Sequence, residues 1–145
     1  MTSSPSSPTS CSSPYSSDWL FALRVVVFAA GVPILMRLPI DRVARWITPS
    51  GGAKNEPSAH EVSRLVATID AWLTRSWPLV RTGCVVRGVT LFRFLRRAGA
   101  DVSLRFGIGL FEGSIAGHCW VEYHGEPLAE LRDPRPVFSE TWAFR

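Results

Sequence analysis

Two residues in this chain combine a reactive side chain with a sequence context that suits nucleophilic catalysis. Cys84 begins a stretch, residues 84–98, with apolar and basic side chains at helical spacing, and Gly99 follows as a helix stop. Unpaired N–H groups at the start of a helix favour the thiolate form of a cysteine in the first turn. His118 lies in residues 117–123, which alternate in the manner of a strand. A thiolate with an imidazole base within reach is the core of nucleophilic cysteine chemistry.

A third group normally fixes the imidazole in such sites, and two acids that follow His118 are candidates. If the chain after the strand forms a hairpin with a two-residue turn near Gly125, alternation places Asp133 on the same face as His118. A three-residue loop with a bulge would place Glu130 there instead. The hairpin geometry therefore favours Asp133, with Glu130 as its rival. Alternation also points Cys119 away from His118, so Cys119 is predicted to be a core thiol.

The elements that must position these residues begin with predicted helices. Residues 19–38 are the most apolar stretch, and we predict two buried helices that meet near Pro33, with membrane contact as the less favoured alternative. Asp41 is predicted to cap a short helix that ends at residue 47. Residues 58–61 form a capping-box pattern, Ser-x-x-Glu, that opens a helix ending near residue 75.

Strands are predicted to follow the helix of Cys84, because the apolar period changes from 3.6 to 2 after residue 101. A loop is expected at residues 112–117, and the strands are expected at residues 102–110, 117–123, 128–133 and 137–144. Helices followed by an antiparallel meander define an α+β fold.

Composition narrows the class of protein. The 145 residues are 46% hydrophobic, so the chain is predicted to fold as one domain over residues 19–145, with an apolar helical lead (19–57) and a catalytic core (58–145). The Ser- and Pro-rich residues 1–18 are expected to be a disordered tail. The net charge of +4 comes from scattered arginines, which argues against nucleic-acid binding. Three cysteines without Cys-x-x-Cys spacing argue against a zinc site and favour a reducing cytoplasm.

Residues 81–133 resemble the transglutaminase-like, papain-fold cysteine proteases of lasso-peptide biosynthesis. The resemblance extends over nearly everything after residue 18. It is carried by Arg-Thr-Gly-Cys84 with Arg87 one turn on, the helix end Leu95-Arg96-Arg97-Ala98-Gly99, the strand Val102 to Leu110, Gly117-His118-Cys119-Trp120-Val121-Glu122, Gly125-Glu126-Pro127 and Asp133-Pro134-Arg135. The apolar lead with Leu38-Pro39-Ile40-Asp41-Arg42-Val43-Ala44-Arg45 also resembles the family's N-terminal half. The family usually has Ala where this chain has Cys119. Its acid spacing falls on Glu130, where Asp is usual, whereas Asp133-Pro134 matches an Asp-Pro pair common after the histidine strand of transglutaminase-like folds.

The resemblance implies a function, a substrate and partners. Cys84 and His118, with Asp133 or Glu130, would remove the leader from a ribosomally made precursor peptide through a thioester, without cofactor or metal. A separate leader-recognition protein would deliver the precursor, and an ATP-dependent macrolactam synthetase would use the freed amine. Two alternatives are an acyl transferase on the same scaffold and a catalytically silent peptide-binding scaffold.

The sequence identifies only one of the two hydrogen-bond donors expected in an oxyanion hole. The N–H of Cys84 is one donor by position. Papain-type sites commonly add a Gln side chain, and the chain contains no Gln. A second donor is therefore left open among Thr82, Trp77 and a loop N–H.

Overall fold

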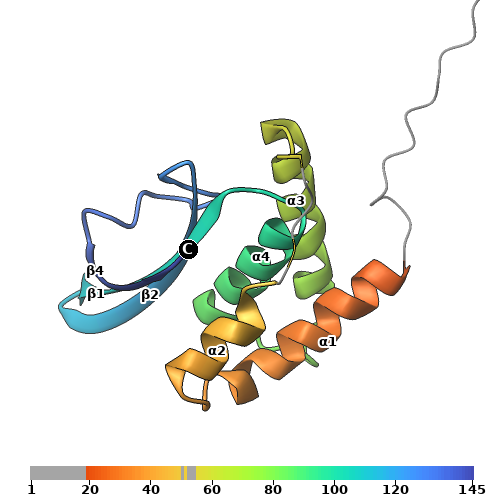
Figure 1. The fold of residues 1–145 in the computed structure, drawn as a ribbon. Helices are drawn as coiled ribbons and strands as arrows, with labels where there is room; N and C mark the ends of the chain where they lie inside the picture. The colour runs from red at the N-terminus through yellow and green to blue at the C-terminus, as the bar shows by residue number, and fades with distance from the viewer. Residues whose placement is uncertain (1–18, 50, 52–54) are drawn as a thin grey trace, which may run out of the picture.

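The computed structural model describes residues 19–49, 51 and 55–145, and the predicted tail at residues 1–18 lies outside them (Figure 1). Within these residues four helices come first: α1 (Trp19–Leu35), α2 (Ile40–Ile47), α3 (Ala59–Arg75) and α4 (Cys84–Arg97). A four-stranded sheet follows: β1 (Val102–Phe111), β2 (Ser114–Tyr123), β3 (Glu126–Pro127) and β4 (Phe138–Phe144). The predicted α+β class is confirmed.

The apolar lead forms one helix, α1, so the predicted break near Pro33 is wrong. Pro33 is accommodated because it stands in the last turn, two residues before the helix ends. One face of α1 is buried against the domain, through Ala22, Val25, Ala29 and Val32. The prediction of a buried helix is therefore correct for that face only. Among the described residues, no helix is long and apolar enough to cross a membrane.

The predicted capping box at the start of α3 is confirmed. The Glu61 N–H donates to the Ser58 hydroxyl at 3.3 Å, and the Ser58 N–H donates to the Glu61 carboxylate at 2.8 Å. The Ser58 hydroxyl and backbone hold the pKa of Glu61 below its usual value. At α2 the predicted cap is wrong, because Pro39 occupies the cap position and Asp41 lies in the first turn.

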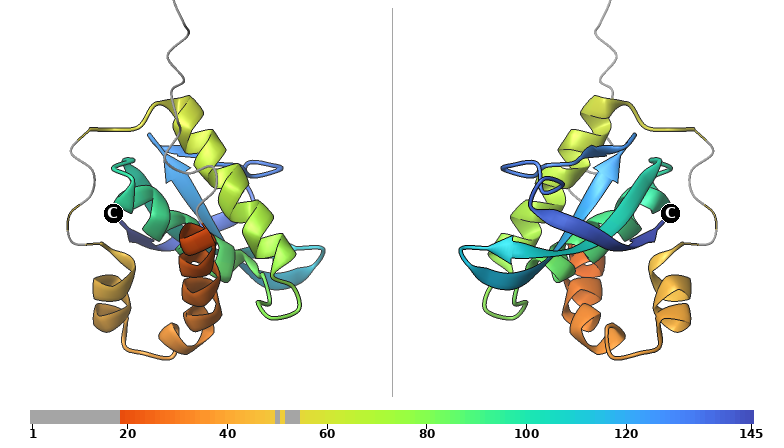
Figure 2. Two further views of the ribbon diagram at one scale, coloured as in Figure 1. Left: turned by 90° about the vertical axis from the view of Figure 1, so that its right-hand side faces the viewer. Right: turned by 90° about the vertical axis from the view of Figure 1, so that its left-hand side faces the viewer.

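Helix α4 lies between the sheet and the other helices (Figures 1 and 2). Its central residues Val89, Leu91, Phe92 and Leu95 are completely buried. Gly88 allows the helix to approach β2 closely, since a Cβ atom at this position would lie 2.8 Å from the Cys119 sulfur. This contact is one turn after Cys84 and sets the distance between α4 and β2, the strand that carries His118.

The sheet is antiparallel with strand order β3-β2-β1-β4, which is not the predicted meander. The predicted two-residue turn exists at His124–Gly125, both with positive φ. The third strand, however, stops at Pro127 instead of continuing to residue 133. Ala129, with φ of +54°, turns the chain out of the sheet. The chain then crosses to the far edge, where β4 pairs with β1, and the β1–β2 hairpin extends beyond the helices (Figure 2).

Candidate active site

Cys84 is the first residue of α4, as predicted, and its side chain is half-buried. The preceding residue, Gly83, occupies the cap position and offers no side chain to the first-turn amides. Cys84 borders a cavity of about 260 Å³ together with Thr82, Gly83 and residues of α3. The helix start therefore presents a thiol and free N–H groups to a shared space, which suits an oxyanion. Of the proposed second donors, Thr82 lines this cavity.

His118 lies on β2 and contacts an acid directly. Its Nε2 atom lies 3.2 Å from a carboxylate oxygen of Glu130. The imidazole is stacked near Trp120, with ring centroids 6.0 Å apart, and lies against Phe138 at 5.1 Å. Because Glu130 occupies Nε2, the remaining ring nitrogen, Nδ1, is the one available to a thiol.

Glu130 forms an ion pair with a cation from α4, the helix that begins at Cys84. Its second carboxylate oxygen lies 3.2 Å from Nη1 of Arg87, which is one turn after Cys84. Arg87 also forms a two-pronged ion pair with Asp70 of α3, with both N–O distances 2.9 Å, and donates to the Ala129 carbonyl. These bonds raise the pKa of Arg87 despite its partial burial. Arg87 thus joins α3, α4 and the loop that carries Glu130.

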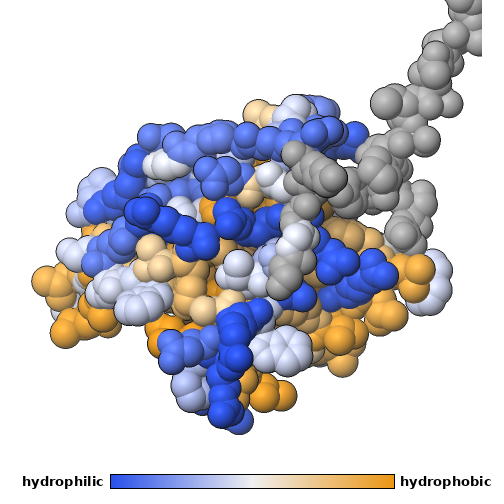
Figure 3. Space-filling model, in the orientation of Figure 1, coloured by the Kyte–Doolittle hydropathy of each residue, from blue (hydrophilic) through white to orange (hydrophobic). Residues whose placement is uncertain are grey.

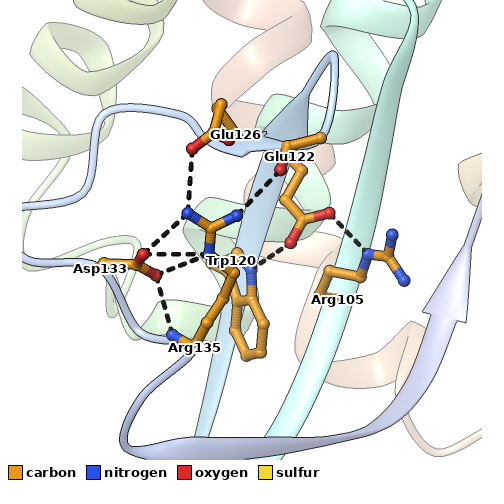
Figure 4. A network of polar contacts seen from close by, with 7 residues as sticks. Arg105, Trp120, Glu122, Glu126, Asp133 and Arg135 are labelled. Carbon is orange, nitrogen blue, oxygen red and sulfur yellow. Dashed lines mark hydrogen bonds and ion pairs between the residues drawn. The ribbon is translucent and has the colours of Figure 1, made fainter.

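Among the described residues, no hydrogen bond or ion pair joins Asp133 to His118, and β3 ends at Pro127, so the hairpin that favoured Asp133 does not extend that far. Its carboxylate accepts three bonds from the Arg135 guanidinium, at 2.8, 2.9 and 3.0 Å, and one from the Arg135 N–H (Figure 4). These bonds keep the pKa of Asp133 below its usual value. Arg135 also reaches Glu126 at 2.9 Å and ties the loop to the β2–β3 turn. Asp133 is exposed and holds the loop in place.

Cys84 and His118 are connected through Arg87 and Glu130 and not by a direct bond. Among the described residues, no hydrogen bond joins the thiol to the imidazole. His118, Glu130 and Asp133 border a cavity of about 750 Å³, which is separate from the cavity beside Cys84. Arg87 borders both cavities and is the physical link between the two halves of the site.

The other residues of the His-x-Trp-x-Glu strand support its structure. The Trp120 indole N–H donates to Glu122 at 3.2 Å, and Arg105 of β1 contacts the same carboxylate at 2.9 Å (Figure 4). Glu122 is buried and satisfied by these two partners. This network fixes the ring beside His118, and it keeps Glu122 away from the imidazole.

The predicted role of Cys119 as a core thiol is confirmed. Only 2% of the residue is exposed, and its sulfur faces Gly88 of α4. Burial, followed by the charges of Cys84 and Glu130, raises the pKa of Cys119 far above its usual value. A buried thiol that resists ionisation is a poor nucleophile, and Cys84 is the more accessible of the two described cysteines.

Sequence reasoning missed the structural role of Arg87 and overlooked Asp70 altogether. Arg87 has one signal in the sequence: it follows Cys84 by three residues and so shares its helix face. Asp70 has no such signal, because its partner, Arg87, belongs to another helix. Among the described residues, no group of three or more potential ligands is arranged to hold a metal ion.

The α+β fold places a half-buried cysteine at the start of a helix that packs on a sheet with a histidine–acid pair, which are the residue types of nucleophilic cysteine chemistry. The chain belongs to the Transglutaminase-like superfamily, whose family model matches residues 22–143. This superfamily includes cysteine proteases and acyl transferases. Searches among the curated proteins and the solved structures find no match.

Proposed function

We propose that this protein is a cysteine protease that removes the leader from a ribosomally synthesised lasso-peptide precursor, with Cys84 as nucleophile, His118 as base and Glu130 as orienting acid. One observation carries the proposal: Glu130 contacts His118 with one oxygen and Arg87, from the helix of Cys84, with the other. This arrangement gives the imidazole a fixed orientation relative to that helix. Family membership supports the chemistry, and the motifs around Cys84 and His118 support the narrower substrate.

The proposed reaction has two steps. Cys84 loses its proton to Nδ1 of His118, and the thiolate attacks the carbonyl carbon at the leader–core junction. His118 then gives the proton to the leaving amine as the peptide bond breaks, which frees the core and leaves the leader as a thioester. Water, deprotonated by His118, releases the leader acid and restores the thiol. Glu130 supports the imidazolium, and amides at the start of α4 support the oxyanion.

The cavity beside His118 supports a peptide substrate. Its lining is apolar at Phe111, Leu131 and Val137 and polar at the His118 end, and these three side chains are exposed. An extended peptide can place side chains on this apolar surface while its backbone approaches the imidazole. A separate leader-recognition protein and an ATP-dependent macrolactam synthetase remain part of the proposal through the family resemblance.

The proposal is tested by incubating the full chain with its precursor and recognition protein, followed by mass spectrometry. Loss of the leader mass is expected. A mass gain from an added amine would instead indicate an acyl transferase, and an unchanged precursor would indicate a binding scaffold. Both outcomes would contradict the proposal.

Two substitutions separate the nucleophile from the other described thiol. Cys84→Ala is expected to abolish processing while the precursor still binds, which can be followed by fluorescence anisotropy. Cys119→Ala is the matched control, because it removes a buried thiol on the opposite side of β2 from His118. We expect it to retain cleavage. Continued cleavage by Cys84→Ala would show that the nucleophile is misassigned.

A further inference from the structure

Helix α1 carries an apolar stripe on its exposed face. Trp19, Leu23, Val27 and Ile34 are 69, 50, 61 and 67% exposed, and their spacing places them along one side of the helix. The opposite face is buried in the domain, so α1 is apolar on both sides. In Figure 3 the edge of the molecule where α1 runs is largely hydrophobic. Exposed apolar side chains on an ordinary protein surface are scattered singly, whereas these four form a continuous apolar area.

A cavity with three arginines adjoins this stripe. It measures about 500 Å³, lies between α1, α3 and α4, and has Arg24, Arg93 and Arg97 in its lining. The rest of the lining is apolar and aromatic: Phe21, Val27, Phe28, Leu65, Phe94 and Ala98. Within residues 19–49, 51 and 55–145, no acidic residue borders the cavity.

The three arginines are not neutralised by carboxylates. None of them belongs to an ion pair among the described residues. Arg93 lies 5.0 Å above the Phe28 ring and donates to the Trp46 carbonyl, which orients its guanidinium. Burial and the neighbouring charge of Arg97 lower the pKa of Arg93. This repulsion would be relieved by a bound anion.

We infer that α1 rests on the surface of an anionic phospholipid bilayer, with a lipid phosphate in the cavity of Arg24, Arg93 and Arg97. Val27 belongs to both the stripe and the cavity lining, so one surface presents apolar side chains and cations together. Apolar side chains that enter the membrane interface and cations that attract anionic lipids both strengthen binding at a bilayer surface. Guanidinium groups pair well with phosphate oxygens.

The helix lies flat in this arrangement, because its inner face is already committed to the protein core. Val25, Ala29 and Val32 have no exposed surface. Only the stripe is free to enter the boundary between headgroups and acyl chains, to a depth of about 5–10 Å. Trp19 at one end of the stripe is a residue type suited to that boundary.

Charge favours a membrane over a second copy of the chain. Residues 19–49 contain Arg24, Arg37, Arg42 and Arg45 against a single acid, Asp41. A two-fold interface through α1 would bring the same positive patch of both copies together, which is repulsive. An anionic lipid surface attracts every one of these side chains, and each arginine near such a surface contributes about a fivefold gain in binding.

Co-sedimentation of the full chain with vesicles tests the inference. Vesicles of phosphatidylglycerol and phosphatidylcholine are expected to bind the protein, pure phosphatidylcholine vesicles are expected to bind it weakly, and added salt should release it. Arg24→Gln with Arg97→Gln should weaken binding about 25-fold. Arg96→Gln is the matched control, since Arg96 is on the same helix but pairs with Asp101 at 3.4 Å. It should retain most of the binding.

A second pair of variants tests the stripe. Ile34→Glu should abolish vesicle binding, whereas Ile115→Glu, at an 81% exposed position of β2, should not. Both positions are exposed, so circular dichroism should show folded protein. No binding to anionic vesicles, or binding that the arginine pair does not affect, would overturn the inference. Light scattering that shows a dimer dissociated by Ile34→Glu, without vesicle binding, would identify a second copy as the occupant and overturn it as well.

Discussion

Arg87→Met is the substitution that most directly tests how the site is assembled. Arg87 donates four hydrogen bonds: two to Asp70, one to Glu130 and one to the Ala129 carbonyl. The change leaves two carboxylates without a counter-charge. Exposed pairs contribute about 0.5 kcal/mol and broken buried pairs cost about 3–5 kcal/mol. For these half-buried groups we expect a loss of roughly 2 kcal/mol in the free energy of unfolding.

The catalytic effect should be larger than the loss of folded protein. Without Arg87 the Glu130 carboxylate is free to move, and the imidazole of His118 loses its fixed orientation. A displacement of about 1 Å at a reacting group costs about 100-fold in rate, so kcat should fall by that order with little change in KM. Arg87→Lys should recover part of the stability and less of the rate, because an ammonium cannot hold both carboxylates in the same geometry.

The assay measures precursor cleavage by mass spectrometry and the folded fraction by urea denaturation for the same samples. Arg96→Met is the control, because it removes a cation from the same helix and only breaks an exposed pair with Asp101. Arg96→Met should leave the cleavage rate and the folded fraction close to those of the unmodified protein. If Arg87→Met, corrected for its folded fraction, cleaves within threefold of the unmodified protein, the proposed positioning by Arg87 is refuted.

Three further predictions concern residues around the site. Glu130→Gln should lower the cleavage rate by about 100-fold or more and Asp133→Asn by less than threefold, because only Glu130 contacts His118; equal losses would contradict this. Gly88→Ala should destabilise the fold by about 1 kcal/mol in urea denaturation, since overpacking against the Cys119 sulfur exceeds the gain in helix propensity, and Cys119→Ala should restore part of the loss. Because burial raises the pKa of Cys119, its thiol stays neutral in the folded state but ionises in the unfolded state above about pH 8.5. The free energy of unfolding should therefore fall by roughly 2 kcal/mol by pH 10, and Cys119→Ala should remove that part of the fall.

The sequence correctly predicted the elements whose ends are determined by residues close by in the chain. The Ser58–Glu61 capping box, the start of the helix at Cys84 and the alternation of β1 depend on neighbouring residues only. The two-residue turn at His124–Gly125 was predictable for the same reason. In each case the deciding contact spans no more than one helical turn or one hairpin turn.

The choice of acid could not be predicted in this way, because it depends on where one strand stops. The register of the hairpin holds for two residues, and extending it by four more residues would place Leu131 opposite His118 and Asp133 on the same face of the sheet as His118. A positive φ at Ala129 ends that register. Alanine rarely adopts a positive φ, so the sequence does not predict this turn. The partner of Glu130 on α4 is a long-range contact, which the order of residues along the chain does not reveal.

Two contacts on one face of α4 determine where Cys84, the proposed nucleophile, lies relative to His118, its proposed base. Arg87, three residues after Cys84, holds Glu130 and through it His118. Gly88, four residues after Cys84, lets the helix settle against β2 beside the strand position next to His118. Arg87 and Gly88 lie on the same helix face as Cys84, because residues three and four positions apart are neighbours on a helix. Both contacts therefore act directly on the position of the Cys84 thiol. A change at either position should therefore alter catalysis through geometry, although neither side chain takes part in the reaction.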